Sequence, residues 1–408
     1  MAYLPLANLL HHKLRSLLSA LGIGIGICML ITLSGLARGS LHEVADRWES
    51  VDADLIVLPR GWGDNASDKS GSGLADGYAR KIRADHGEMV ARVVPVFTWQ
   101  MKLAGQDHMA AGVDPNDWPT LTGGRALSEG RLFDPNGAFA RWIERKLLAP
   151  STGEEDEEEI VEISPEQLAE AGRSGLELVI DSRLAEAGGL AVGQRVRAAN
   201  HDWEIVGIVP AGAMTRVFLP RRAAQFLFGS GDIRKSTLMF VKLRRGVDVG
   251  PAARAIQNTI RQDVVPLSRY RGMLVEKFGI LFVYVDMVNV IALVIAFLFI
   301  MVTLYTMVLQ RTREIAILRS CGATGLFILR QVLAESVLLT GLGTAIGIGL
   351  SFPAAWAIRA ARPLLTVAIT WQWIALAIAA AAAGALLSGL WPAWRAVKID
   401  VVEALTLE

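Results

Sequence analysis

The sequence predicts a polytopic α-helical membrane protein with four transmembrane helices and a large extracytoplasmic α/β domain inserted between helices 1 and 2. Two observations support this fold class. The 408 residues are 52% hydrophobic and 20% charged, which is too apolar for an ordinary soluble enzyme and too charged for a chain wholly inside a bilayer. The apolar residues gather in long uncharged runs, and a large polar region separates the first run from the others.

The apolar runs have the length that a membrane span requires. A transmembrane helix needs about 20 mostly apolar residues to cross about 30 Å of hydrocarbon. We predict such helices at residues 16–37, within 278–309 together with a stalk, within 326–358 and at 366–394. A cleaved signal peptide is the alternative for the first run, but this run is longer than a signal-peptide core, so we expect it to be retained.

Basic residues next to the runs predict the orientation of the chain, because Lys and Arg accumulate on the cytoplasmic side. They flank the spans in the N-terminal segment 1–15, in the segment 310–325 and in the tail 395–408. We expect these three parts, including both termini, to be cytoplasmic, and the first of them to be amphipathic. Residues 38–277 and the short loop 359–365 are then expected on the outer side.

The large polar region has the pattern of an α/β domain. Residues 52–61 (DADLIVLPRG) form an apolar run closed by Pro and Gly, which is typical of a strand, and residues 251–262 have the pattern of an amphipathic helix. A second, mostly β subdomain is expected at about 114–220. The acidic run at 154–162 lies inside it and is interpreted as a solvated loop, because it lacks the spaced ligands and the glycine turn of a calcium loop.

Several residues of the spans have predicted roles. Gly22 and Gly26 are spaced so that two helices can pack closely at them. Asp286 lies near the outer end of the second span, where we expect it to be solvated or paired. Arg330 and Glu335 lie near the inner end of the third span and are expected at the membrane interface.

No catalytic motif is recognisable in the sequence. It contains no H-E-x-x-H, G-x-S-x-G or C-x-x-C motif and no phosphate-binding G-x-x-x-x-G-K-[ST] loop, and its six histidines lack ligand spacing. The net charge of +1 does not suggest a nucleic-acid partner. We therefore expect neither an enzyme nor a bound cofactor or metal in this chain, and no nucleic-acid partner.

A short charged helix is predicted between the second and third spans, in QRTREIAILRSCGAT at 310–324. We expect Gly322 to end this helix in the left-handed conformation and Thr324 to cap the next one. The helix is either a positive anchor that fixes the topology or a surface for a cytoplasmic protein, since Ile315 and Leu318 would share one face. Its candidate contact residues are Arg311, Arg313, Glu314, Ile315, Leu318 and Arg319.

Three segments resemble the FtsX-like/MacB-type permeases of ABC transporters. The segment QRTREIAILRSCGAT is similar to that family's E-R-x-R-E-I-G-x-L-x-A-x-G-A signature before the third span. HKLRSLLSALGIGIGI at 12–27 and WPAWRAVKIDVVEAL at 391–405 resemble the family's first and last segments, and the order of the spans is also that of the family. The chain departs from the family pattern at Gln310, Ala316 and Val401, which replace an acidic residue, a glycine and a proline.

The resemblance implies a homodimer in a bacterial inner membrane, with a separate ABC ATPase subunit that carries ATP and Mg on the cytoplasmic side. The segment 310–325 would be the coupling helix that receives movement from the ATPase, and Gly22 and Gly26 would pack transmembrane helices. The complex would export or extract a substrate, with a membrane-fusion adaptor or another periplasmic protein as a further partner. Two alternatives stay open: a mechanotransmitter that regulates a periplasmic cell-wall hydrolase, and a membrane receptor without an ATPase.

Overall fold

The computed structural model describes residues 13–61, 73–134, 176–229 and 234–397. The chain divides into two compact units: a helical unit, Met1–Leu41 with Phe278–Glu408, and an α/β unit, His42–Lys277. The acidic run at 154–162, most of the segment predicted to be amphipathic and the end of the predicted tail lie outside the described residues.

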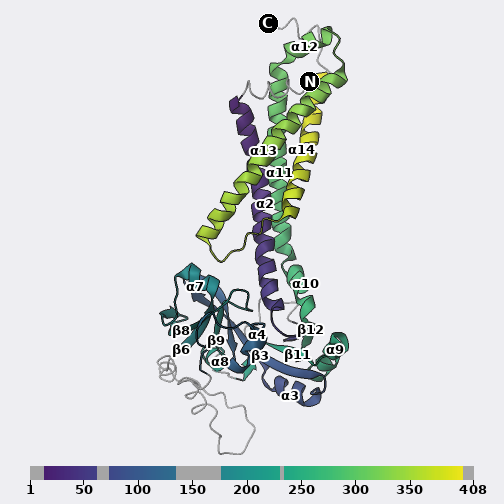
Figure 1. Ribbon diagram of the computed structural model, residues 1–408. Coiled ribbons are helices and arrows are strands. Elements are labelled where there is room, and N and C mark those ends of the chain that lie inside the picture. The colour runs from purple at the N-terminus through teal and green to yellow at the C-terminus, as the bar shows by residue number, and fades with distance from the viewer. Residues whose placement is uncertain (1–12, 62–72, 135–175, 230–233, 398–408) are drawn as a thin grey trace, which may run out of the picture. The chain divides into compact units, whose positions relative to one another are not determined.

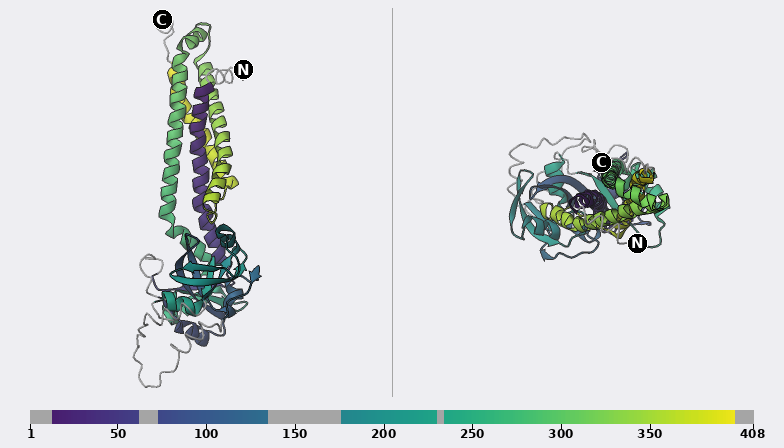
Figure 2. Two further views of the ribbon diagram at one scale, coloured as in Figure 1. Left: turned by 90° about the vertical axis from the view of Figure 1, so that its left-hand side faces the viewer. Right: turned by 90° about the horizontal axis from the view of Figure 1, so that it is seen from above.

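Long apolar helices lie side by side in the helical unit (Figures 1 and 2). Within the described residues, four helices are long and apolar enough to cross a membrane. They are α2 (Lys13–Glu49), α11 (Gly279–Gln310), α13 (Gly325–Ala361) and α14 (Trp371–Val397). The boundary between the two units falls inside α2. These four helices, with the α/β unit between the first and the second, confirm the predicted fold class.

Helices α2 and α13 approach closely because glycines line their contact. A Cβ atom built on Gly347 would lie 2.6 Å from the carbonyl oxygen of Gly24 and 2.7 Å from Cβ of Ile27. A Cβ atom on Gly343 would lie 2.7 Å from Cβ of Ile23. Atoms do not approach this closely without displacement, so only glycine fits at these two positions of α13.

The glycines singled out in the sequence, Gly22 and Gly26, face α11 instead. A Cβ atom on Gly26 would lie 3.3 Å from the carbonyl oxygen of Ala292, which is a tight fit. A Cβ atom on Gly22 would lie 3.5 Å from the Phe299 ring, which is an ordinary van der Waals distance. The need for glycine is therefore stronger at Gly26 than at Gly22.

Asp286 of α11 is paired within the helical unit. Its Oδ2 atom lies 3.6 Å from Nη2 of Arg38 on α2, and its side chain is 55% exposed. The Arg38 guanidinium also lies 4.9 Å from the ring centre of Trp373, a cation–π distance. The expectation that Asp286 is solvated or paired is confirmed.

One twisted sheet organises the α/β unit. Within the described residues, ten strands form it in the order β12-β1-β11-β3-β4-β9-β6-β8-β5, and β7 pairs with β8. A second small sheet pairs β2 (Leu74–Ala75) with β10 (Lys235–Ser236). The strands of the large sheet are β1 (Leu55–Leu58), β3 (Val90–Leu103), β4 (Gln106–Val113), β5 (Glu129–Gly130), β6 (Leu176–Asp181), β7 (Arg195–Ala198), β8 (His201–Val209), β9 (Val217–Pro220), β11 (Leu238–Leu243) and β12 (Asp263–Pro266).

The first half of the sheet has the strand order of a split βαβ fold. Strands β12, β1, β11 and β3 are antiparallel neighbours, and helix α3 (Gly77–Asp85) connects β1 to β3 along the chain, while α9 (Val249–Ile260) connects β11 to β12. Both helices bury apolar side chains against the sheet, among them Ile82 and Ile256. The apolar run predicted as a strand at 52–61 is β1, and all four of its residues are buried.

The second half of the sheet is joined to the first by one long strand. The first part of β3 pairs with β11, and the part from Phe97 to Leu103 pairs with β4. The segment predicted as a β subdomain at 114–220 contributes β5 to β9, which continue the same sheet. The other helices in the described residues of the α/β unit are η1 (Pro115–Asp117), α4 (Trp118–Leu121), α7 (Ser182–Gly188), α8 (Arg221–Phe228) and α10 (Leu267–Lys277).

Candidate functional site

The segment between α11 and α13 forms a helix with well-defined ends, α12 (Thr312–Ser320). Gly322 has φ of 93°, and its N–H donates to Arg319 O while the N–H of Ala323 donates to Leu318 O, both at 3.0 Å. This is the hydrogen-bond pattern of a Schellman motif, which requires a left-handed residue and so favours glycine. The Thr324 hydroxyl accepts from Phe327 N at 3.3 Å and caps α13. Both expected helix boundaries are confirmed.

One side of α12 is fixed to the helical unit. Ala316 is fully buried, and the half-buried Ile315 packs against a small apolar cluster. The cluster brings together residues from the end of α11, the start of α13 and the end of α14. Its buried members are Val308, Ile328, Val332 and Ala393.

An ion pair adds a polar contact on the same side. Arg311, at the junction of α11 and α12, lies 3.7 Å from a carboxylate oxygen of Glu335 on α13 and 3.9 Å from one of Glu314. The side chain of Glu335 is only 8% exposed. The position of Glu335 at the membrane interface stays a prediction, and the structure shows that its carboxylate turns inward toward Arg311.

The opposite side of α12 is exposed and carries apolar residues. Ile317 is 48% exposed and Leu318 is 37% exposed, and the charged Arg313 and Glu314 lie exposed beside them. We call these four residues the outer face of α12. Arg319 is half-buried.

Ile315 does not belong to this outer face, contrary to the expectation that it shares a face with Leu318. The two are neighbours on the helix surface, but Ile315 falls on the buried side, next to Ala316. Sequence reasoning also missed Ile317. No local signal identifies it, because Ile315 and Ile317 each lie one residue from Ala316 and so about 100° from it around the helix.

A second cluster of charged residues surrounds the C-terminal part of α2 in the α/β unit. Glu43 Oε1 accepts hydrogen bonds from three guanidinium groups, those of Arg47 at 2.9 Å, Arg183 at 3.0 Å and Arg216 at 2.8 Å. Burial lowers the pKa of Arg216, and the nearby Arg47 lowers it further, while Glu43 raises it. One carboxylate thus connects α2 to α7 and to the segment that precedes β9.

Arg47 extends the network to a fully buried carboxylate. Its Nη2 atom donates to Oδ2 of Asp181 at 3.1 Å, and Asp181 has no exposed surface. The other oxygen of Asp181 accepts from Leu184 N at 2.8 Å and caps α7. Asp181 therefore stabilises a helix start and a buried cation at the same time.

Helix α10 is attached to α2 on another side. Arg271 donates to Asp46 at 2.6 Å and to Glu49 at 2.7 Å, and the rings of Trp48 and Tyr270 are stacked 4.8 Å apart. The last two turns of α2 are thus held by both charged and aromatic contacts. A rotation or shift of this end of α2 would have to move the neighbouring elements of the α/β unit with it.

The described residues contain no group of three or more His, Cys, Asp or Glu side chains placed to hold a metal ion. The charged clusters are ion pairs between partners, and neither is a nucleophile–base arrangement. Among the described residues, the two features that stand out are the exposed outer face of α12 and the C-terminal end of α2, which is held by ion pairs.

Comparison with known proteins gives matches along most of the chain. The sequence model for the MacB-like periplasmic core domain matches residues 16–259, and the model for the FtsX-like permease C-terminal region matches residues 287–401. The macrolide export ATP-binding/permease protein MacB of Chlorobium luteolum is 25% identical over 97% of this chain and 58% of its own length. The ABC transporter permease YknZ of Bacillus subtilis is 22% identical over 99% of this chain and 98% of its own length.

Among solved structures, the periplasmic region of MacB from Actinobacillus actinomycetemcomitans matches 55% of this chain and 94% of its own, with 12% identity and a TM-score of 0.37. The chain thus spans 58% of the length of the Chlorobium protein but nearly all of YknZ. Neither of the two matching family models describes an ATPase domain.

Proposed function

Because the chain belongs to the permease family with a MacB-like periplasmic core domain and an FtsX-like C-terminal region, we propose that it couples ATP hydrolysis by a separate ABC ATPase to movement of its α/β domain. The four apolar helices and the family fit a bacterial inner membrane. In this proposal the chain holds no nucleotide itself. It acts as a dimer with two ATPase subunits, and the movement exports or extracts a substrate.

The observation that carries this proposal is the outer face of α12. A helix that served only as a topological anchor would need basic residues alone. Here the helix is fixed on its buried side by Ala316 and the Arg311–Glu335 pair, while Ile317 and Leu318 are presented outward beside charges. Exposed apolar anchors with a charged rim are the usual composition of a protein-docking surface. A helix held in this way transmits a push to α11 and α13 instead of yielding to it.

The test replaces Leu318 by aspartate. We expect at least about a tenfold loss of ATPase copurification and of coupled activity, since central apolar anchors of an interface contribute about 2 kcal/mol or more. The tagged permease is purified from its own membranes, and the bound protein is identified by its nucleotide-binding motifs and quantified by mass spectrometry.

Ser320→Asp is the matched control, because it places the same charge on an exposed position of the same helix. Arg313→Ala removes one rim charge and should change binding little, since exposed charges contribute about 0–1 kcal/mol. If Leu318→Asp keeps the ATPase bound at equal membrane levels, α12 is an anchor and the proposal is wrong.

The proposal also places α12 and both termini in the cytoplasm. Cys28 and Cys321 are the two cysteines of the chain, and the second lies exposed directly after α12. In a Cys28→Ser variant, a membrane-impermeant maleimide should label Cys321 only after the membrane of spheroplasts is opened. In a second variant, Cys321 is also replaced by serine and a cysteine is introduced at Ser268, which is exposed on α10. This cysteine should react before the membrane is opened. The opposite labelling pattern would reverse the orientation.

A further inference from the structure

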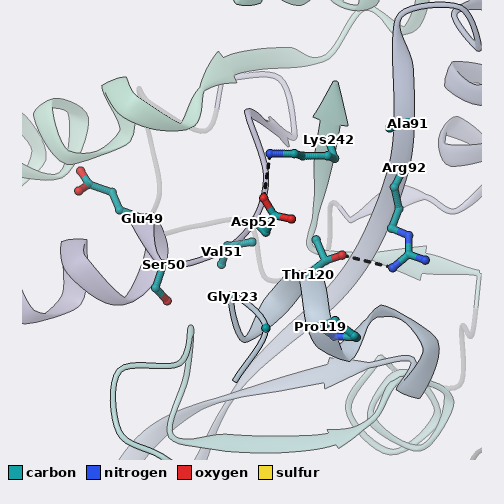
Figure 3. Close-up of a pocket in the computed structure, with 11 residues that line it drawn as sticks. Glu49, Ser50, Val51, Asp52, Ala91, Arg92, Pro119, Thr120, Gly123 and Lys242 are labelled. Carbon is teal, nitrogen blue, oxygen red and sulfur yellow. Dashed lines mark hydrogen bonds and ion pairs between the residues drawn. The ribbon is translucent and has the colours of Figure 1, made fainter. Parts of the chain in front are cut away.

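The α/β unit contains an open pocket of about 730 Å³ at the C-terminal end of α2 (Figure 3). Its walls come from α2 and the following turn, from strands β3 and β11, and from α4 with the loop after it. The lining residues are Glu49, Ser50, Val51, Asp52, Ala91, Arg92, Pro119, Thr120, Gly123, Gly124 and Lys242. The pocket is thus bordered by polar groups of both signs, and none of them has a role in the docking of α12.

Two cations face each other on one wall of this pocket. Arg92 of β3 and Lys242 of β11 are direct cross-strand partners, so their side chains lie on the same face of the sheet. Like charges in this position destabilise a sheet unless an anion lies near them. Lys242 has such anions, because its Nζ atom lies 2.8 Å from Asp52 and 3.5 Å from Asp54, and these contacts raise the pKa of Lys242.

Arg92 has weaker hydrogen-bond and ion-pair partners within the protein than Lys242 has. Its Nη1 atom lies 3.3 Å from the Thr120 hydroxyl, 3.4 Å from Asn116 O and 4.0 Å from Asp117. All three contacts are long for a guanidinium, which prefers short, paired hydrogen bonds to a carboxylate. The side chain is 47% exposed, so its remaining donors are open to a ligand.

The other side of the pocket is negative. Glu49 and Ser50 lie at the C-terminal end of α2, where the helix dipole favours a positive charge. Asp52 follows in the next turn, with 62% of its side chain exposed. Figure 3 shows Glu49 and Arg92 on separate sides of the pocket, with Asp52 and Thr120 between them.

We propose that this pocket binds a short peptide-like zwitterion, with the ligand carboxylate on Arg92 and the Thr120 hydroxyl and the ligand ammonium on Asp52 and the end of α2. Glu49 already accepts hydrogen bonds from Arg271, and Asp52 lies 2.8 Å from Lys242, but 62% of the Asp52 side chain is exposed, so Asp52 can also accept from a ligand ammonium. The volume accommodates more than one amino-acid residue. This site is independent of the proposed ATPase contact, since every lining residue belongs to the α/β unit.

The experiment uses diglycine as probe and the full chain in detergent micelles. Saturation-transfer NMR detects binding, and calorimetry gives the affinity. We expect Arg92→Gln to weaken diglycine binding about tenfold, because a hydrogen bond to a charged group contributes about 1.5–3 kcal/mol. Arg254→Gln, an exposed arginine on α9, is the control and should leave the affinity unchanged.

Two further probes separate the charges of the ligand. N-acetylglycine carries only the carboxylate and glycinamide only the ammonium, and each should bind about tenfold more weakly than diglycine. Arg92→Lys keeps the charge without the paired donors and should bind diglycine with an intermediate affinity. This variant tests the role of Arg92 if Arg92→Gln fails to fold. The proposal fails if the wild type does not bind diglycine, if Arg92→Gln binds it equally, or if N-acetylglycine or inorganic phosphate binds as tightly.

Discussion

Replacing Gly347 by leucine is expected to prevent α2 and α13 from packing and to leave little folded protein. A Cβ atom at this position would already lie 2.6 Å from the Gly24 carbonyl oxygen, and that oxygen belongs to the backbone of a helix and cannot rotate away. The two helices would have to separate along their contact. Inserting side-chain atoms into a packed interior usually costs about 1–3 kcal/mol, and a backbone clash belongs at or above the top of that range.

Gly349 provides a matched control on the same helix. A Cβ atom at Gly349 meets nothing within 4 Å, so Gly349→Leu adds the same side chain where there is space. The comparison is made by size-exclusion chromatography and by the midpoint of thermal unfolding in detergent. If the Gly347 variant is as monodisperse and as stable as the Gly349 variant, the close contact of α2 and α13 does not contribute to stability.

Replacing Asp181 by alanine is expected to destabilise the α/β unit by about 3–5 kcal/mol, the usual cost of breaking a buried ion pair by removing one partner. The loss would leave Arg47, which is 6% exposed, close to Arg183 and Arg216 with one carboxylate fewer. It would also remove the cap of α7. The decrease is measured as the free energy of unfolding of the full chain in urea.

Two variants separate these contributions. Asp181→Asn keeps an oxygen that can accept from Leu184 N but removes the charge, so it should retain the cap and lose the ion pair. Its free energy of unfolding is expected to lie between those of the wild type and Asp181→Ala. Asp202→Ala removes an exposed carboxylate from β8 and should change the stability by less than about 0.5 kcal/mol. Equal stability of Asp181→Ala and the wild type would refute the structural role of this network.

The membrane helices and the ends of α12 were predictable because their signals are local. Length and hydropathy identify a span, and a glycine or threonine at a helix boundary has a direct conformational reason. The partners of these elements were not predictable from one sequence. The sequence shows only how far Glu335 lies from the span end, whereas its ion pair with Arg311 joins α13 to the residue that precedes α12.

The same limit applies to α12, to the glycines of the helical unit and to the charged network around Glu43. The spacing of Ile315 and Leu318 indicates one face, but which side of α12 is buried depends on α11, α13 and α14. Likewise, the glycines that fit most tightly against α2 are on α13, and a spacing pattern alone does not rank them above Gly22 and Gly26. The network around Glu43 joins residues far apart in the sequence, and no local pattern connects them.

Strand β3 has a consequence for how the α/β unit loses its structure. Its 14 residues pair with β11 along Val90–Val96 and with β4 along Phe97–Leu103, so one continuous backbone belongs to both halves of the sheet. Withdrawing one part of β3 from its partner leaves the N–H and C=O groups of that part unpaired and displaces the part of the same strand that belongs to the other half. We therefore expect the two halves to melt in one cooperative transition, with amide hydrogens on both sides of Phe97 exchanging at the same slow rate.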